Sequence, residues 1–241
     1  MGIKNSKMKL INENSPLKCL PVELGKKSIL IFDSLRFTCE IIDHCYGQLT
    51  EELLKLSTNI TEKKAPQILG YAWSIIDNSK RLVSLCEQLP WENKSEIVGH
   101  LFYVNEFRNT FQHLDERIEE SLLKTDTPFY GIISWFYKYQ NSKKVDLLYL
   151  ISGNVISANS ELTVPNLENS NSELNHILLH TVNRKGEQIK TDIFEIMNNL
   201  KKLVSELEGR LEAHCSQFNL NLCNWGNRQD VLIRLQQETN D

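Results

Sequence analysis

The residues best suited to chemistry lie in one short stretch of the chain, residues 106–117, which reads EFRNTFQHLDER. Arg108 is followed directly by Asn109, and His113 comes five residues after the arginine. A histidine can take up or release a proton near neutral pH, and the planar fork of an arginine can hold two phosphate oxygens. Such a pair could cleave RNA without a metal ion. The histidine would move the proton of the 2′-OH or of the leaving oxygen, and the arginine would offset the charge of the phosphorane.

The hydrophobic pattern around this stretch predicts one continuous helix from Ser95, the expected N-cap, to about Leu123. On a helical wheel the apolar side chains share one arc: Val104, Phe107, Phe111, Leu114, Ile118 and Leu122. A separate polar arc holds Asn105, Arg108, Asn109, Gln112, His113 and Glu116. We therefore expect Arg108, Asn109 and His113 to face away from the core as a catalytic group. Asn105, Gln112 and Glu116 would support them. A solvated helix face of the same composition is the alternative.

Three other stretches carry a helical period. We expect helices over about 22–57 and 66–85, with Pro66 in the first turn of the second, and a last long helix over 193–218 that Asp192 caps. Between them, residues 129–191 are rich in aromatic and β-branched residues. The segments GIISWFYKY, KKVDLLYLISG, NVISA, ELTVP, HILLHTV and EQIKT are typical of strands, and NRKG is typical of a hairpin turn.

These elements predict a mainly α fold, an antiparallel helical bundle with a small antiparallel β insertion before the last long helix. The expected parts are an N-terminal arm over 1–21, a bundle built from 22–128 and 192–218, the β insertion over 129–191 and a C-terminal tail over 219–241.

The amino-acid composition argues against several classes of function. No apolar run approaches the ~20 residues that cross a bilayer, so we expect no membrane partner. The net charge of −4 argues against broad electrostatic binding of nucleic acid but leaves room for a local basic pocket. The six cysteines form no CxxC or CxxxC pair, which favours reduced thiols in a cytoplasmic protein over a zinc site. We expect neither a metal nor a cofactor.

Weaker candidates have simpler interpretations. Glu40 and His44 have the spacing of a metal pair but lack a third ligand, which favours an ordinary helix-surface pair. His176 and His180 share one face of an expected strand, but no carboxylate or cysteine is spaced to complete a metal site with them. The aromatic residues within 135–139 could stack on bases, although a sheet core with an exposed aromatic edge is the favoured interpretation.

The sequence from Arg108 to His113 resembles the Rx4–6H signature of HEPN domains, including the polar residue favoured after the arginine. The resemblance covers about 22–123 and, loosely, 193–218, whereas the sheet of 129–191 departs from a minimal HEPN bundle. HEPN domains are all-α bundles, and many are metal-independent endoribonucleases whose active site forms where two copies of the motif meet. The resemblance implies a catalytic His113, a phosphate-binding Arg108 and a supporting Asn109.

By this resemblance the protein would be a cytoplasmic homodimer that cleaves RNA, with tRNA as one candidate, leaving a 2′,3′-cyclic phosphate. It would act in a prokaryotic defence or toxin–antitoxin system, with an antitoxin or another defence protein as partner. The alternative is a non-catalytic helical module that regulates a partner, or one that binds RNA without cutting it.

Overall fold

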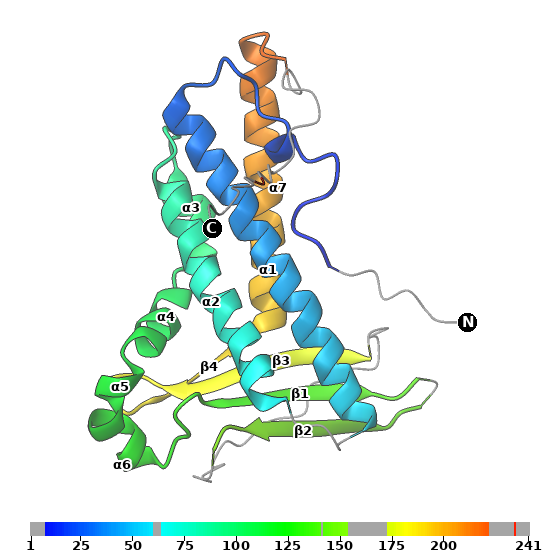
Figure 1. The fold of residues 1–241 in the computed structure, drawn as a ribbon, viewed down its shortest axis with the longest axis vertical. Helices are drawn as coiled ribbons and strands as arrows, with labels where there is room; N and C mark the ends of the chain where they lie inside the picture. The colour runs from blue at the N-terminus through cyan, green and yellow to red at the C-terminus, as the bar shows by residue number, and fades with distance from the viewer. Residues whose placement is uncertain (1–7, 60–63, 141, 154–172, 222–233, 235–241) are drawn as a thin grey trace, which may run out of the picture.

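The computed structural model describes residues 8–59, 64–140, 142–153, 173–221 and 234. Three long helices stand side by side: α1 (Lys26–Thr58), α2 (Ala65–Glu87) and α7 (Ile193–Gln217). α2 and α7 run in one direction and α1 in the other, and a four-stranded sheet lies across one end of all three (Figure 1). The expectation of a mainly α fold with a small antiparallel sheet is therefore confirmed.

The ends of the long helices follow from local signals. Pro66 lies in the first turn of α2, where its missing amide costs nothing. The Asp192 carboxylate accepts a hydrogen bond from the Phe194 amide at 2.9 Å and caps α7 as expected. Both sequence predictions are confirmed.

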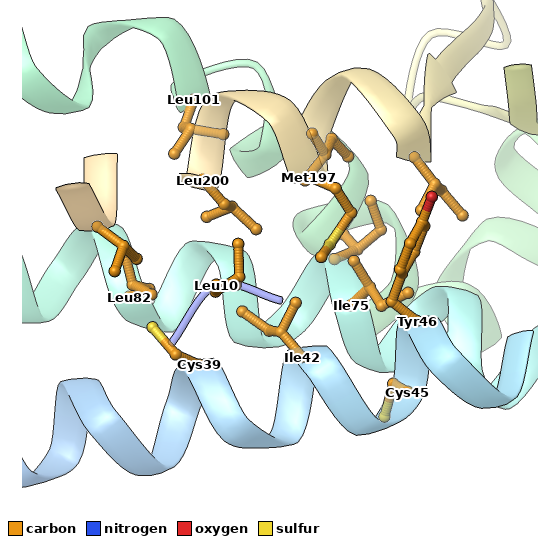
Figure 2. Close-up of a cluster of buried hydrophobic side chains, with 14 of the residues drawn as sticks. Leu10, Cys39, Ile42, Cys45, Tyr46, Ile75, Leu82, Leu101, Met197 and Leu200 are labelled. Atoms are coloured by element: carbon orange, nitrogen blue, oxygen red, sulfur yellow. The ribbon is translucent and has the colours of Figure 1, made fainter. Parts of the chain in front are cut away.

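One hydrophobic core joins the three helices. In Figure 2, Cys39 and Ile42 of α1 face Leu82 and Ile75 of α2, while Met197 and Leu200 of α7 close the cluster from the other side. All of these side chains are buried, and fully burying one such side chain stabilises the fold by about 1.5–3 kcal/mol. Most of the fold's stability therefore comes from the inward stripes of α1, α2 and α7.

The N-terminal residues that the structure describes belong to this core and do not form a separate arm. Leu10, Ile11 and Leu17 are buried in the same cluster. The Leu10 amide donates to both carboxylate oxygens of Asp43 on α1, at 2.8 and 3.0 Å. Within the expected arm over 1–21, the described residues pack on the bundle, because burying the apolar side chains at 10, 11 and 17 against the helices is more favourable than leaving them in solvent.

The sheet has the strand order β2-β1-β3-β4, with every neighbouring pair antiparallel. The strands are β1 (Ile132–Lys138), β2 (Val145–Ile151), β3 (Leu174–Val182) and β4 (Gln188–Asp192). Ile133, Trp135 and Leu179 join the helical core, and the Trp135 indole N–H donates to Ser57 Oγ of α1 at 2.8 Å. The sheet thus shares its core with the bundle.

Four of the six expected strands match β1–β4, and NRKG forms the turn between β3 and β4. The other two, NVISA and ELTVP, lie outside the described residues, as does most of the expected tail over 219–241. Trp135, Phe136 and Tyr137 are buried, so these rings belong to the sheet interior and are not available to stack on bases.

The third expected helix is broken into short pieces, which corrects the prediction of a continuous helix to Leu123. The pieces are α3 (Lys94–Val98), a 3-10 turn (Gly99–Leu101), α4 (Val104–Gln112), α5 (Leu114–Arg117), a π-helical turn (Ile118–Leu122) and α6 (Leu123–Thr125). The expected cap is also wrong, because α3 starts at Lys94 behind Asn93, whose φ is +56°, and Ser95 lies within the helix.

The main break falls at His113, whose backbone (φ −121°, ψ 28°) ends α4. Arg117 is only 7% exposed, while Ile118, expected in the core, is 42% exposed. One straight helix that buries Val104 and Phe107 cannot also bury Arg117 and expose Ile118. The break at His113 and the π-helical turn rotate the later residues about the helix axis, so that Arg117 is buried and Ile118 is exposed.

Candidate functional site

The Arg108–His113 motif is positioned by the packing of α4 against α2. Trp73 of α2 and Phe111 of α4 stack with ring centroids 4.6 Å apart and planes 13° from parallel. One turn later in α2 and one turn earlier in α4, Arg108 Nε donates to Asp77 Oδ1 at 3.1 Å. Arg108 thus lies outside the hydrophobic core, and its side chain leans across α2 toward Asp77.

Asp77 lies between two arginines. Its second carboxylate oxygen accepts from Arg81 Nη2 at 3.0 Å, and the side chains of Arg108 and Arg81 are 32% and 57% exposed. Ion pairs this exposed contribute about 0.2–1 kcal/mol each, so their main effect is to orient the two guanidinium groups. Within the described part of the chain, the terminal nitrogens of Arg108 have no hydrogen-bond partner. Two cations around one carboxylate leave a net positive charge that could bind phosphate.

His113 is held by a carboxylate of its own. Its Nδ1 lies 3.1 Å from Glu116 Oε1, and its side chain is 48% exposed. An Nδ1–H bonded to a carboxylate leaves Nε2 as the free proton acceptor. We assign this tautomer from the position of Glu116. The structure therefore brings together one of the expected supporting residues and the expected catalytic histidine.

The remaining predicted site residues are less engaged. Asn109 and Gln112 are exposed and, among the described residues, hydrogen-bond to no side chain. Asn105 is half-buried, and its Oδ1 is buried without a partner in the described structure. No hydrogen bond within the described segments joins Arg108 to His113, so the two groups are placed independently, by Asp77 and by Glu116.

A second contact fixes α4 to the sheet. Asn183, in the turn between β3 and β4, donates through its side-chain amide to Glu106 Oε1 at 2.9 Å and to Glu187 Oε2 at 2.7 Å. Nearby, Arg117 Nη1 donates to Glu120 Oε2 at 2.7 Å. The motif segment is thus held from α2 on one side and from the hairpin on the other.

The sheet histidines have structural partners. His176 Nδ1 lies 2.6 Å from Asp192 Oδ2, and His180 Nε2 lies 2.8 Å from Ser134 Oγ. Ser134 is fully buried, so this Ser–His pair is closed to a substrate. Burial, with Lys190 nearby, lowers the pKa of His180 to about 4.

We therefore expect acid to destabilise the fold through His180. The unfolded chain, with a histidine pKa of about 6.5, binds the proton first, so unfolding is favoured as the pH falls from 6.5 to 4. At 1.36 kcal/mol per pH unit the shift corresponds to roughly 3 kcal/mol. Urea unfolding at pH 7 and pH 4.5 measures this loss. His180→Gln should lose less stability than the wild type, and His100→Gln, at an exposed histidine, should behave as the wild type. Equal losses in wild type and His180→Gln would contradict the assignment.

The described segments contain little that could form a metal site or a reactive cysteine. No group of three His, Cys, Asp or Glu side chains converges in them. Glu40, the expected partner of His44, instead binds Arg36 at 3.0 Å. Four of the cysteines are buried, and burial raises the pKa of Cys86 to about 12, which leaves its thiol unreactive. None of the helices in the described ranges combines the length and apolar character that crossing a bilayer requires.

Sequence reasoning did not find the two side chains that orient the site through α2, Trp73 and Asp77. Asp77 lies 31 residues before Arg108, and no local pattern marks the pairing. Comparison with known proteins adds no further guide: no family model, no curated protein and no solved structure matches the chain. The HEPN resemblance rests on residues 108–113 and the helical pattern alone.

Proposed function

We propose that this protein is a metal-independent endoribonuclease with a HEPN-like arrangement of its helices. The observation that carries the proposal is the state of the two motif side chains. Arg108 and His113 are each oriented by one carboxylate and each keep their outer nitrogens available to a ligand. A solvated helix face would not require either arrangement.

In the proposed reaction the 2′-OH of a nucleotide attacks the adjoining phosphorus and the bond to the 5′-oxygen breaks. His113 Nε2 takes the proton from the 2′-OH or, when protonated, gives one to the leaving oxygen. Glu116 stabilises the imidazolium that forms. Arg108 holds the non-bridging phosphate oxygens as their charge grows. The products are a 2′,3′-cyclic phosphate and a 5′-OH.

A homodimer belongs to this proposal. The reaction needs one group to accept a proton and another to donate one, and His113 is the single histidine between residues 101 and 125. A second copy of the motif would supply the other. The partner system remains a prediction: a defence or toxin–antitoxin module with a protein that restrains the nuclease.

The test is cleavage of labelled tRNA and of total RNA in EDTA by the wild type and by an Arg108→Ala/His113→Ala variant purified in the same way. We expect wild-type fragments that end in a 2′,3′-cyclic phosphate and none from the variant. RNA with 2′-O-methyl groups should resist both proteins, because it lacks the attacking hydroxyl. Equal cleavage by the two proteins would refute the proposal.

One observation favours a second function, a non-catalytic interaction module. The Arg108–Asp77 pair continues the Trp73–Phe111 contact, which is what a structural arginine between two helices would do. In that case Asp77→Ala would destabilise the fold and no preparation would cleave RNA. The EDTA assay therefore separates the two functions.

A further inference from the structure

Two exposed aromatic rings lie in a turn that Trp73, the residue stacked on Phe111 of the motif helix, holds by its backbone. Phe129 and Tyr130 occupy the corners of the turn between α6 and β1, which closes with a hydrogen bond of 2.8 Å from the Gly131 amide to the Pro128 carbonyl. They are 36% and 48% exposed, and their rings meet edge to face with centroids 4.9 Å apart. Gly, Pro, Asn, Asp and Ser dominate turns. Local turn formation therefore does not explain two large rings at these corners.

The turn is held rigidly. The Trp73 indole N–H donates to the Tyr130 carbonyl at 3.0 Å, and Ser152 Oγ donates to the Gly131 carbonyl at 3.0 Å. Gly131 has a φ of +80°, and a Cβ there would collide with the His180 carbonyl oxygen, so only glycine fits. The rings are thus presented by a fixed backbone, and a ligand would not have to order it.

α2 connects the turn that carries these rings to the cationic group. Trp73, Asp77 and Arg81 lie at successive turns of α2, with a rise of about 6 Å between neighbours. The first holds the Tyr130 backbone and the second holds Arg108. The turn that carries the two rings and the two guanidinium groups are therefore attached to the same stretch of α2, and we call these four side chains the strip.

We propose that this strip, made of Phe129, Tyr130, Arg108 and Arg81, binds a short single-stranded stretch of RNA. Bases stack on the two rings and the adjoining phosphates lie on the two guanidinium groups. The naming of RNA as the ligand rests on the proposed function. Rings followed by cations match a nucleotide, whose apolar face and anionic phosphate alternate along the strand. An apolar protein segment would not neutralise the positive charge that remains when two guanidinium groups share the one carboxylate of Asp77.

The local charge determines whether base stacking or phosphate contacts contribute more to the affinity. Residues 104–128 carry three basic side chains, Arg108, Arg117 and Lys124, against six acidic ones, Glu106, Asp115, Glu116, Glu119, Glu120 and Asp126. General attraction of phosphate is therefore weak, and stacking supplies most of the affinity. With two phosphates contacted, the logarithm of the binding constant should fall with the logarithm of salt concentration with a slope of about −1.4.

The experiment measures binding separately from cleavage. A fluorescein-labelled ten-nucleotide RNA in which every sugar is 2′-O-methyl cannot be cut by 2′-OH attack, and its anisotropy reports affinity for the full chain. Phe129→Ala and Tyr130→Ala should each weaken binding by roughly 5- to 150-fold. Phe218→Ala, at a 57% exposed ring on the C-terminal side of α7, should bind as the wild type. The same strand in a duplex should bind more weakly, because its bases are already stacked.

The outcomes distinguish this site from the proposed reaction. Ring-dependent binding supports the strip, even if the wild type fails to cleave RNA, in which case only the proposed function fails. Unchanged binding by the Phe129→Ala/Tyr130→Ala double variant, with a native circular-dichroism spectrum, overturns the strip. Cleavage that still requires His113 would then leave the proposed function standing. Failure of the wild type to bind the oligonucleotide overturns the strip as well.

Discussion

His113→Ala is expected to lower the rate of RNA cleavage by about 10²- to 10⁴-fold, the usual contribution of a positioned acid or base. The side chain is 48% exposed at the junction between α4 and α5, so its removal leaves the core intact. Single-turnover cleavage of a labelled RNA in EDTA gives the rate. Binding of the 2′-O-methyl strand should change little, because proton transfer and strand binding use different groups.

Glu116→Gln provides the graded comparison. A glutamine can still accept a hydrogen bond from His113 Nδ1 but carries no charge to stabilise the imidazolium, so the loss should be smaller than that of His113→Ala. Glu119→Gln is the matched control, since Glu119 is an exposed glutamate in the next turn. If Glu119→Gln and Glu116→Gln slow cleavage equally, Glu116 has no specific role. If His113→Ala cleaves at the wild-type rate, His113 is not the acid or base.

The parts of the fold that the sequence predicted well are those that local patterns determine. α1, α2 and α7 each carry a long apolar stripe, and a stripe of that length can be buried only in a helix packed on others. The β3–β4 hairpin follows from its NRKG turn in the same way. Each of these signals lies within the element it specifies.

The motif segment was predicted less well because its conformation depends on distant contacts. A continuous apolar pattern covers Val104 to Leu122, yet Arg117 is buried and the helix breaks at His113. Packing against the sheet and the β3–β4 hairpin determines which side chains are buried after His113. A short stretch of sequence around His113 carries no information about those distant contacts. The pairing of Arg108 with Asp77 across 31 residues is likewise invisible to a helical wheel.

The exposed rings of Phe129 and Tyr130 could not be predicted from the sequence for the same reason. In the sequence the prominent aromatic group was residues 135–139, and its first three rings are buried in the sheet. Phe129 and Tyr130 precede that group and have no periodic signal of their own. Their exposure follows from the turn at 128–131, whose geometry depends on Gly131 approaching β3 and on the Trp73 hydrogen bond from α2.

Trp73→Ala is expected to lower the free energy of unfolding by about 3–5 kcal/mol, the usual cost of truncating a buried tryptophan. Trp73 is 1% exposed, stacks on Phe111 and donates to the Tyr130 carbonyl. Urea unfolding gives the loss. Trp91→Ala, at a partly buried tryptophan that contacts Phe32 of α1, should cost less. A loss of under 1 kcal/mol for Trp73→Ala would contradict the packing of α4 on α2 through Trp73 and Phe111.

Trp73→Phe separates the two roles of this residue. The phenyl ring keeps the stack on Phe111 but loses the N–H, so stability should fall by only about 1 kcal/mol, the net value of one hydrogen bond. The Tyr130 carbonyl then loses its tie to α2, and the aromatic turn becomes less fixed. If the turn is preorganised for a strand, affinity for the 2′-O-methyl oligonucleotide should fall in Trp73→Phe although the protein stays folded. Unchanged affinity would mean that Gly131 and Ser152 hold the turn without α2, and that Trp73 serves the fold alone.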